Sequence, residues 1–272
     1  MLRLGFPKKK KGEKRFKTQP AGTLTSFKKG ISQLTEAIYH RYKDHIRLNE
    51  AVLTVNKQNE EYIVKTQNQA YWADCLFFCS PAYHLADTIA PLNQRLANAL
   101  RDITYASMAV VGLVFAKSAF VQSPNGFGYL VPTSERSNVL GAVFESNIFS
   151  GRAPEELFLV RVMMGGSKNS EIAHRPNEEL ISMGIEEIKK KFAVRERPKY
   201  TFVQAWPMAI PQYDKKYPQI LETIKNELND LKGITIVSNF LNGVSLSDCV
   251  SNARKAVEEF DIQQPTFANT AV

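Results

Sequence analysis

ITIVSNFLNGVSLSDC, residues 234–249, is the stretch that decides the fold of this chain. Its first half alternates β-branched and polar residues, as a half-buried strand does. Asn242-Gly243 ends that strand, and Ser245 followed by Asp248 has the spacing of a helix capping box. The residues that then recur at helical spacing and mark one apolar face are Leu246, Cys249, Val250, Ala253, Val257 and Phe260. The stretch therefore predicts a strand, a tight turn and a helix.

The predicted turn offers backbone N–H groups at the start of a helix. The backbone N–H groups at the start of the helix would have no intrahelical partners; they belong to Val244, Ser245 and Leu246. Gly243, which has no side chain, would let another molecule come close. The positive pole of a helix suits a negatively charged or electron-rich group. Such turns are common, so a plain strand leading into a capped helix stays open as the alternative.

Composition places the chain among ordinary globular proteins. Its 272 residues, 44% of them hydrophobic, suffice for one large domain or two small ones. Residues 1–17 hold eight basic side chains and one acidic, so they carry nearly all of the net charge of +8. The high pI therefore describes a basic arm and gives no reason to expect nucleic-acid binding. The arm is read as a solvated tail, with an electrostatic contact to anionic lipid as the alternative.

Cysteines, histidines and apolar runs exclude several classes of protein. Cys75, Cys79 and Cys249 form no Cys-x-x-Cys pair, and we expect buried thiols in a reducing compartment. The four histidines lack metal-ligand spacing, so no metal site is predicted. No apolar run is long enough for a membrane span, and no signal-peptide core follows the N-terminal charges. We expect a cytoplasmic protein whose membrane contact, if it has one, is peripheral.

The remaining pattern predicts a mixed α/β fold. An apolar strand at Asp74–Pro81 and the strand from Ile234 have the character of parallel strands, and a long antiparallel-type middle separates them. A hairpin is predicted at residues 46–66, a single helix at 85–100 and a rigid loop at 207–213. The other predicted elements are helices at 32–42, 178–192 and 218–231 and strands at 107–116, 126–132, 139–146, 157–164 and 200–206. We interpret the whole as a nucleotide-binding sheet with a second domain inserted between its strands.

Several blocks match one family in order. They are Phe27–Leu34, Gly126–Pro132 (GFGYLVP), Leu140-Gly141, Met163–Gly166 (MMGG), Trp206–Tyr213 (WPMAIPQY) and Gly243–Cys249. From about Thr23 to Phe260 the chain resembles the C-terminal half of the oxygen-dependent protoporphyrinogen or coproporphyrinogen oxidases, in the flavin-containing amine oxidase superfamily. The GFGYLVP and AIPQY blocks separate this family from monoamine oxidases and phytoene desaturases.

The resemblance implies a domain plan. Residues 23–82 and 206–262 would be the C-terminal parts of an FAD-binding domain with a partial Rossmann-like sheet. Residues 83–205 would be an inserted substrate-binding domain built on an antiparallel sheet. Residues 1–22 and 263–272 would be tails.

It also implies site residues and a reaction. The backbone of Val52 would meet the adenine end of FAD, and Asn239 with Val244, Ser245 and Leu246 would lie against the flavin ring. The residues expected to line the porphyrinogen pocket are Phe127, Gly128, Leu130 and Met163, with plain sheet core as the alternative. The family oxidises a porphyrinogen to a porphyrin in haem biosynthesis, with repeated hydride transfer to FAD and O2 as final acceptor. No residue is assigned a catalytic acid–base role.

The chain departs from the family pattern at the phosphate-binding turn. The family begins with a Gly-x-Gly-x-x-Gly turn that holds the FAD pyrophosphate, and no such motif occurs here. We therefore expect little or no FAD binding by the isolated chain, which would be a fragment or one half of a split protein with a separate N-terminal half as partner. A non-catalytic tetrapyrrole-binding module and another flavin amine oxidase are the alternatives.

Overall fold

The computed structural model describes residues 26–135 and 137–263. The chain divides into two compact units, residues 1–46 and 47–272, and each is described by itself. The described part of the first unit holds helix α1 (Ser32–Tyr42) and the short 3-10 helix η1 (Lys43–His45). The predicted helix is confirmed, and none of its residues is buried. Its exposed large apolar side chains include Ile38, Tyr39 and Tyr42.

The second unit begins with a three-stranded antiparallel sheet. Strands β1 (Val52–Gln58) and β2 (Glu61–Thr66) form the predicted hairpin, and β3 (Ala70–Ala73), which was not predicted, extends it. Tyr62 is fully buried, and its hydroxyl donates to the Lys232 carbonyl across 2.5 Å. This bond fastens the hairpin to the segment that leads into the next sheet.

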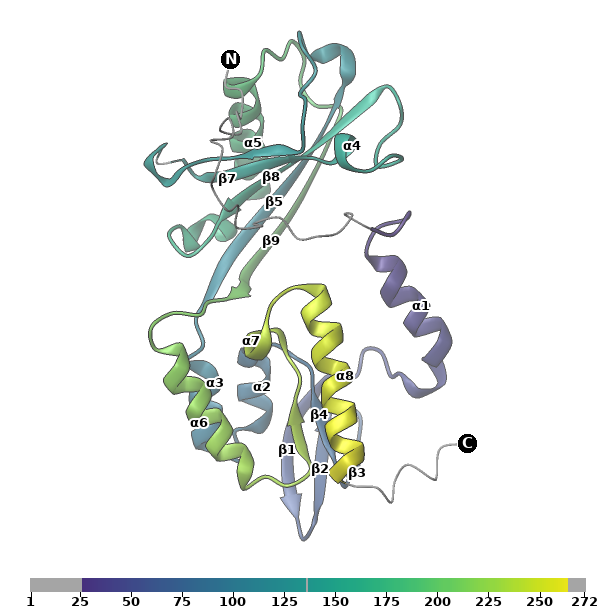
Figure 1. Ribbon diagram of the computed structural model, residues 1–272, viewed down its shortest axis with the longest axis vertical. Helices are drawn as coiled ribbons and strands as arrows, with labels where there is room; N and C mark the ends of the chain where they lie inside the picture. The colour runs from purple at the N-terminus through teal and green to yellow at the C-terminus, as the bar shows by residue number, and fades with distance from the viewer. Residues whose placement is uncertain (1–25, 136, 264–272) are drawn as a thin grey trace, which may run out of the picture. The chain divides into compact units, whose positions relative to one another are not determined.

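The predicted parallel pair is confirmed and lies between helices (Figure 1). Strand β4 (Leu76–Phe78) pairs with β10 (Ile234–Ile236). One face of the pair joins a core with α2 (Ala82–Ile89), α3 (Gln94–Arg101) and α6 (Tyr217–Asn229). On the other face the Phe77 ring lies 5.3 Å from that of Phe260, on α8 (Leu246–Gln263). Helices on both faces are typical of parallel sheets.

Prolines account for two wrong predictions in the second unit. The helix predicted at 85–100 is two helices, because Pro91 lacks an N–H and cannot continue a helix. Asn93 begins the second helix, where its side chain accepts from the Leu96 N–H across 2.9 Å. The loop predicted at 207–213 is mostly strand, since β9 (Tyr200–Pro211) runs through both Pro207 and Pro211. It is an edge strand, where proline is tolerated.

The predicted antiparallel middle is a five-stranded sheet in the order β6-β7-β8-β5-β9. The four further strands are β5 (Tyr105–Ala116), β6 (Gly128–Leu130), β7 (Val139–Phe144) and β8 (Leu157–Gly165). Helix α5 (Asn177–Lys191) packs on one face through Leu180 and Ile188. The remaining short elements are α4 (Glu145–Ile148), α7 (Asn239–Asn242), η2 (Lys117–Ala119), η3 (Thr133–Glu135) and η4 (Ser170–His174).

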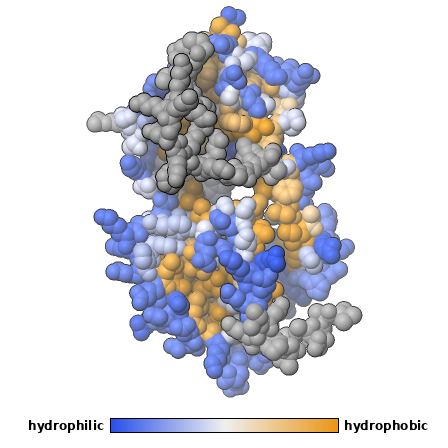
Figure 2. Space-filling view, viewed as in Figure 1, coloured by the Kyte–Doolittle hydropathy of each residue, from blue (hydrophilic) through white to orange (hydrophobic). Residues whose placement is uncertain are grey.

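The cysteines and the surface differ from expectation. Cys75 and Cys249 are half-buried and Cys79 is exposed, so the prediction of buried thiols was wrong. The apolar face of α8 is also largely open, with Val250 59% and Val257 52% exposed. Apolar patches lie between hydrophilic residues on the surface (Figure 2). Among the described residues, no helix has the length and apolarity that crossing a bilayer requires.

Candidate functional site

The carboxyl ends of β4 and β10 lead into the first group of predicted site residues. Ligands of α/β sheets bind at this edge. The Ser238 hydroxyl donates to the Ser80 carbonyl across 2.9 Å and so joins the segments that follow the two strands. Residues 239–242, predicted to continue the strand, form helix α7 instead, because Phe240 turns inward and is fully buried in the core.

Two tyrosines hold α7 in place, one between β9 and α6 and the other at the start of α6. Tyr213 donates to the carbonyl of Asn239 across 3.0 Å, and Tyr217 donates to those of Phe240 and Leu241. The two rings lie 4.5 Å apart. Burial raises the pKa of Tyr217 to about 12, so its hydroxyl keeps its proton at neutral pH. The predicted flavin-contacting residue Asn239 is therefore anchored through its backbone.

The turn between α7 and α8 contains the predicted capping box. Ser245 Oγ accepts from the Asp248 N–H across 3.1 Å, and the Asp248 carboxylate accepts from the Ser245 N–H and Oγ. Gly243 has φ +117°, and a Cβ there would lie 2.6 Å from Asp248 Oδ2. The glycine thus makes room for the carboxylate of the cap.

The cap corrects the predicted electrostatics of this turn. The Ser245 N–H was expected to be free for a ligand, but the carboxylate of Asp248 takes it. That carboxylate also places a negative charge at the positive pole of α8, which weakens the attraction for a second anion. Val244 and Leu246 offer exposed apolar side chains, 47% and 48% accessible. The turn is therefore better suited to apolar contact with a planar ring than to binding an anion.

Val52 lies apart from this turn. It is the first residue of β1, is 42% exposed and pairs with Thr66 in the hairpin. Among the described residues, no hydrogen bond or ring contact joins it to α7 or to the turn. Its backbone contact with an adenine remains a prediction.

The antiparallel sheet brings three of the four predicted substrate residues to one face. Pairing aligns Leu130, Gly141, Met163, Val110 and Gln204 in one row across all five strands. A second row contains Gly128, Val143, Arg161, Gly112 and Phe202. Successive residues of a strand point to opposite faces. The residues of β5 and β8 that alternate with those of the two rows pack in one core with α5. Both rows therefore face away from α5, and we call this surface the open face.

The open face is mostly apolar, and several of its side chains are accessible. Leu130 is 81% exposed and Phe202 61% exposed, while Val110 and Met163 are half-buried. Phe127 does not belong to these rows. It precedes β6, its carbonyl accepts from the Phe144 N–H across 2.8 Å, and its side chain is 65% exposed.

Gly128 is needed for strand pairing. A Cβ at this position would lie 2.1 Å from the carbonyl oxygen of Ala142 on β7, and Gly128 has φ +144°. The glycine was expected to give room to a ligand, but the backbone of β7 takes that room. Gly141 is equally confined, since its Cβ would lie 2.4 Å from the Tyr129 carbonyl oxygen.

Sequence reasoning missed Arg161, Phe202 and Gln204 on the open face. One signal was available for Arg161. In LFLVRVMMG, residues 157–165, it is the single charged residue of an otherwise apolar strand. A charge in such a strand marks a face that is not covered by apolar core.

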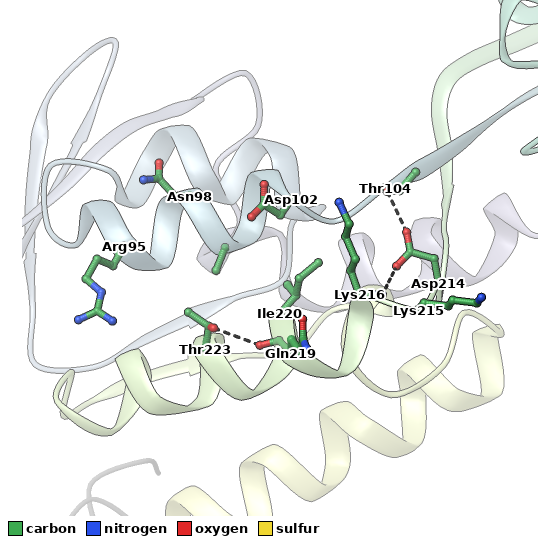
Figure 3. Close-up of a pocket in the computed structure, with 11 residues that line it drawn as sticks. Arg95, Asn98, Asp102, Thr104, Asp214, Lys215, Lys216, Gln219, Ile220 and Thr223 are labelled. Carbon is green, nitrogen blue, oxygen red and sulfur yellow. Dashed lines mark hydrogen bonds between the residues drawn. The ribbon is translucent and has the colours of Figure 1, made fainter.

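A cavity of about 730 Å3 lies away from these residues, between α3 and α6 (Figure 3). Its lining carries both signs of charge, with Arg95 and Lys215 opposed by Asp102 and Asp214. Asp214 already accepts from the backbone N–H groups of Lys216 and Tyr217 at the start of α6. None of the predicted site residues lines this cavity, and we do not assign it a ligand.

Comparisons with known proteins identify the family of the chain. The family profile described as flavin containing amine oxidoreductase matches residues 5–259. The chain is 27% identical over 262 residues to chloroplastic protoporphyrinogen oxidase from Nicotiana tabacum, covering 89% of this chain and 47% of that protein. It is 25% identical to coproporphyrinogen III oxidase from Propionibacterium freudenreichii over 88% of this chain and 45% of that protein.

Solved structures share the fold. A crystal structure from Exiguobacterium sp. 255-15, whose name assigns it to protoporphyrinogen oxidase, superposes with TM-score 0.77 at 22% identity. It matches 90% of this chain and 54% of its own. Cyclohexylamine oxidase from Brevibacterium oxydans superposes with TM-score 0.62 at 13% identity, over 84% of this chain and 53% of its own. The chain thus spans about half the length of the relatives it matches.

Proposed function

Because the chain belongs to the flavin containing amine oxidoreductase family, we propose that it supplies the C-terminal half of a porphyrinogen oxidase. The complete assembly would oxidise a porphyrinogen to a porphyrin with FAD, and O2 would be the final acceptor, as a step of haem biosynthesis. The names of the relatives support the substrate class, and protoporphyrinogen and coproporphyrinogen are both candidates.

The open face is the observation that carries this proposal. Five strands spaced about 4.8 Å apart give an apolar surface roughly 19 Å wide, which is enough for a tetrapyrrole. Leu130, Met163 and Phe202 would contact the macrocycle through apolar side chains, and the thioether of Met163 adapts to an irregular ligand. An exposed apolar patch of this kind is typical of a binding surface.

The residues of this chain would contact the ring end and the adenine end of FAD. Val244, Leu246 and the anchored α7 would bind the ring, Ser245 would fix the turn through its cap, and Val52 would meet the adenine. No phosphate-binding glycine turn occurs in this chain, so the pyrophosphate needs residues from the other half. When bound, the flavin accepts hydride from the substrate, and this is chemistry of the cofactor.

The chain itself would align the two binding surfaces. Strand β9 borders the open face and leads directly to Tyr213, whose hydroxyl holds Asn239. A ligand on the sheet and a ring against α7 would therefore be positioned by one continuous segment. Such orientation is a major part of what a protein adds to cofactor chemistry.

Reconstitution tests the proposal. The purified chain would be measured for bound flavin absorbance and porphyrinogen oxidation, alone and mixed with the N-terminal half of a relative as a separate chain. We expect little flavin and little turnover alone, and both to appear in the mixture. Stoichiometric FAD on the isolated chain would contradict the account of the missing half.

The same mixture separates the alternatives. Saturable porphyrin binding without turnover in the mixture would favour a non-catalytic tetrapyrrole-binding module. Turnover of amines with no oxidation of porphyrinogens would favour another flavin amine oxidase.

A further inference from the structure

Arg161 occupies an unusual position in the open face. It lies in β8, the central strand of the five, with Gly112 of β5 and Val143 of β7 as its cross-strand neighbours. Its side chain is 48% exposed, although it stands in the middle of the sheet. In the two rows that define the open face it is the one charged residue.

An ion pair fixes the orientation of Arg161. Its Nη2 contacts Oε1 of Glu145, the first residue of α4, and the Glu145 side chain is only 12% exposed. A guanidinium has five N–H groups in a planar fork, so this contact leaves donors for a second acceptor. Because the fork is already held, little side-chain entropy would be lost when that acceptor binds.

The neighbours of Arg161 suit an apolar ligand with an acidic arm. Gly112 has no side chain that could cover Arg161. A Cβ at Gly112 would lie 3.1 Å from Phe202 Cδ2, so the phenyl ring lies over the glycine. Met163 follows two residues later on the same face, about 6.6 Å along the strand. A macrocycle over Met163 and Leu130 would therefore extend its edge substituents to Arg161.

We propose that Arg161 binds a carboxylate side arm of the tetrapyrrole that covers the open face. This inference rests on the proposed function, and it names the residue that would orient the substrate on the sheet. Charge-assisted hydrogen bonds from arginine to carboxylate are about twice as strong as neutral ones and are directional. The competing account is that the pair with Glu145 serves only to fasten α4 to β8.

Fluorescence titration of the full chain with protoporphyrin IX and with its dimethyl ester separates these accounts. We expect the free acid to bind about tenfold more tightly than the ester. Arg161→Met should remove that preference by weakening the acid alone, and Arg161→Lys should restore part of it. Arg175→Met is the matched control, because Arg175 has a comparable ion pair with Glu179 outside the open face.

Glu145→Gln provides a second variant that retains Arg161. The amide oxygen of this variant can still accept from the guanidinium and hold it, while the competing negative charge is gone. Binding of the acid should therefore strengthen, and binding of the ester should stay unchanged; weaker binding of the acid would count against the inference. Equal binding of acid and ester to the unmodified chain would overturn the inference about Arg161 while the proposed function stands. Equal weakening of both ligands by Arg161→Met would overturn it too, by showing a structural role. Failure to bind either ligand both alone and with the N-terminal half of a relative added would instead overturn the proposed function, and the inference with it.

Discussion

Tyr213 donates its hydroxyl to the backbone carbonyl of Asn239 across 3.0 Å. The two residues belong to segments that the sequence separates widely, one following the edge strand of the antiparallel sheet and the other beginning α7. The bond thus connects the sheet that forms the open face to the turn that we propose lies against a flavin. Tyr213 thus acts together with Tyr217 to hold α7, the helix that precedes the turn.

Replacing Tyr213 with Phe should loosen α7. The lost hydrogen bond contributes about 1 kcal/mol, which corresponds to roughly fivefold faster local opening. Amide hydrogen exchange of residues 239–242 would measure the change. Tyr200→Phe is the control, since Tyr200 is exposed at the start of β9. Unchanged exchange in Tyr213→Phe would show that Tyr217 alone holds the helix.

Alkaline unfolding should depend on Tyr217. Burial raises its pKa to about 12 in the folded chain, against about 10 for an unfolded tyrosine. A raised pKa means that the stability from this group is complete below about pH 10 and is lost as the pH rises towards 12. Tyr217→Phe should therefore make the decline shallower in this range.

Urea unfolding at a series of pH values between about 9 and 11.5 would test the effect of Tyr217. Tyr200→Phe should keep the original pH slope. Because burial also raises the pKa of Tyr129, some decline should remain in Tyr217→Phe. Identical slopes for the unmodified chain and Tyr217→Phe would contradict this account.

Gly128→Ala should destabilise the fold rather than merely reshape a pocket. The new Cβ would lie 2.1 Å from the Ala142 carbonyl oxygen, so β6 would have to separate from β7. We expect a loss of about 2 kcal/mol or more in the free energy of unfolding. Gly126→Ala is the matched control, because Gly126 has φ +88° but nothing within 4 Å of its Cβ position. Its cost should be about 1 kcal/mol, and equal costs would contradict the packing argument.

Leu130→Ala should separate binding from stability. The side chain is 81% exposed, so its removal should change the free energy of unfolding by no more than about 0.5 kcal/mol. If a porphyrin covers the open face, the lost apolar contact should weaken its binding about tenfold in a fluorescence titration. Val121→Ala, another exposed apolar side chain but outside the two rows, should leave binding unchanged. Unaltered affinity in Leu130→Ala would place the ligand elsewhere.

Local patterns in the sequence determined the hairpin, the identity of both parallel strands and the capping box of Ser245 and Asp248. Each depends on residues close in the chain, where side-chain period and turn chemistry act directly. The motif blocks likewise sufficed to recognise the family. The sequence also sufficed to show that this chain has no Gly-x-Gly-x-x-Gly turn for binding phosphate.

Only the tertiary structure decided which groups of those residues are already occupied by neighbouring segments and which residues share a face. Strand β9 continues through Pro207 and Pro211 because an edge position needs no N–H from them, and no local pattern reveals which strand is at an edge. The Ser245 N–H proved to be taken by its own cap, and the space beside Gly128 by the β7 backbone. Arg161 joined Leu130 and Met163 on one face through strand register, which pairing between distant segments sets.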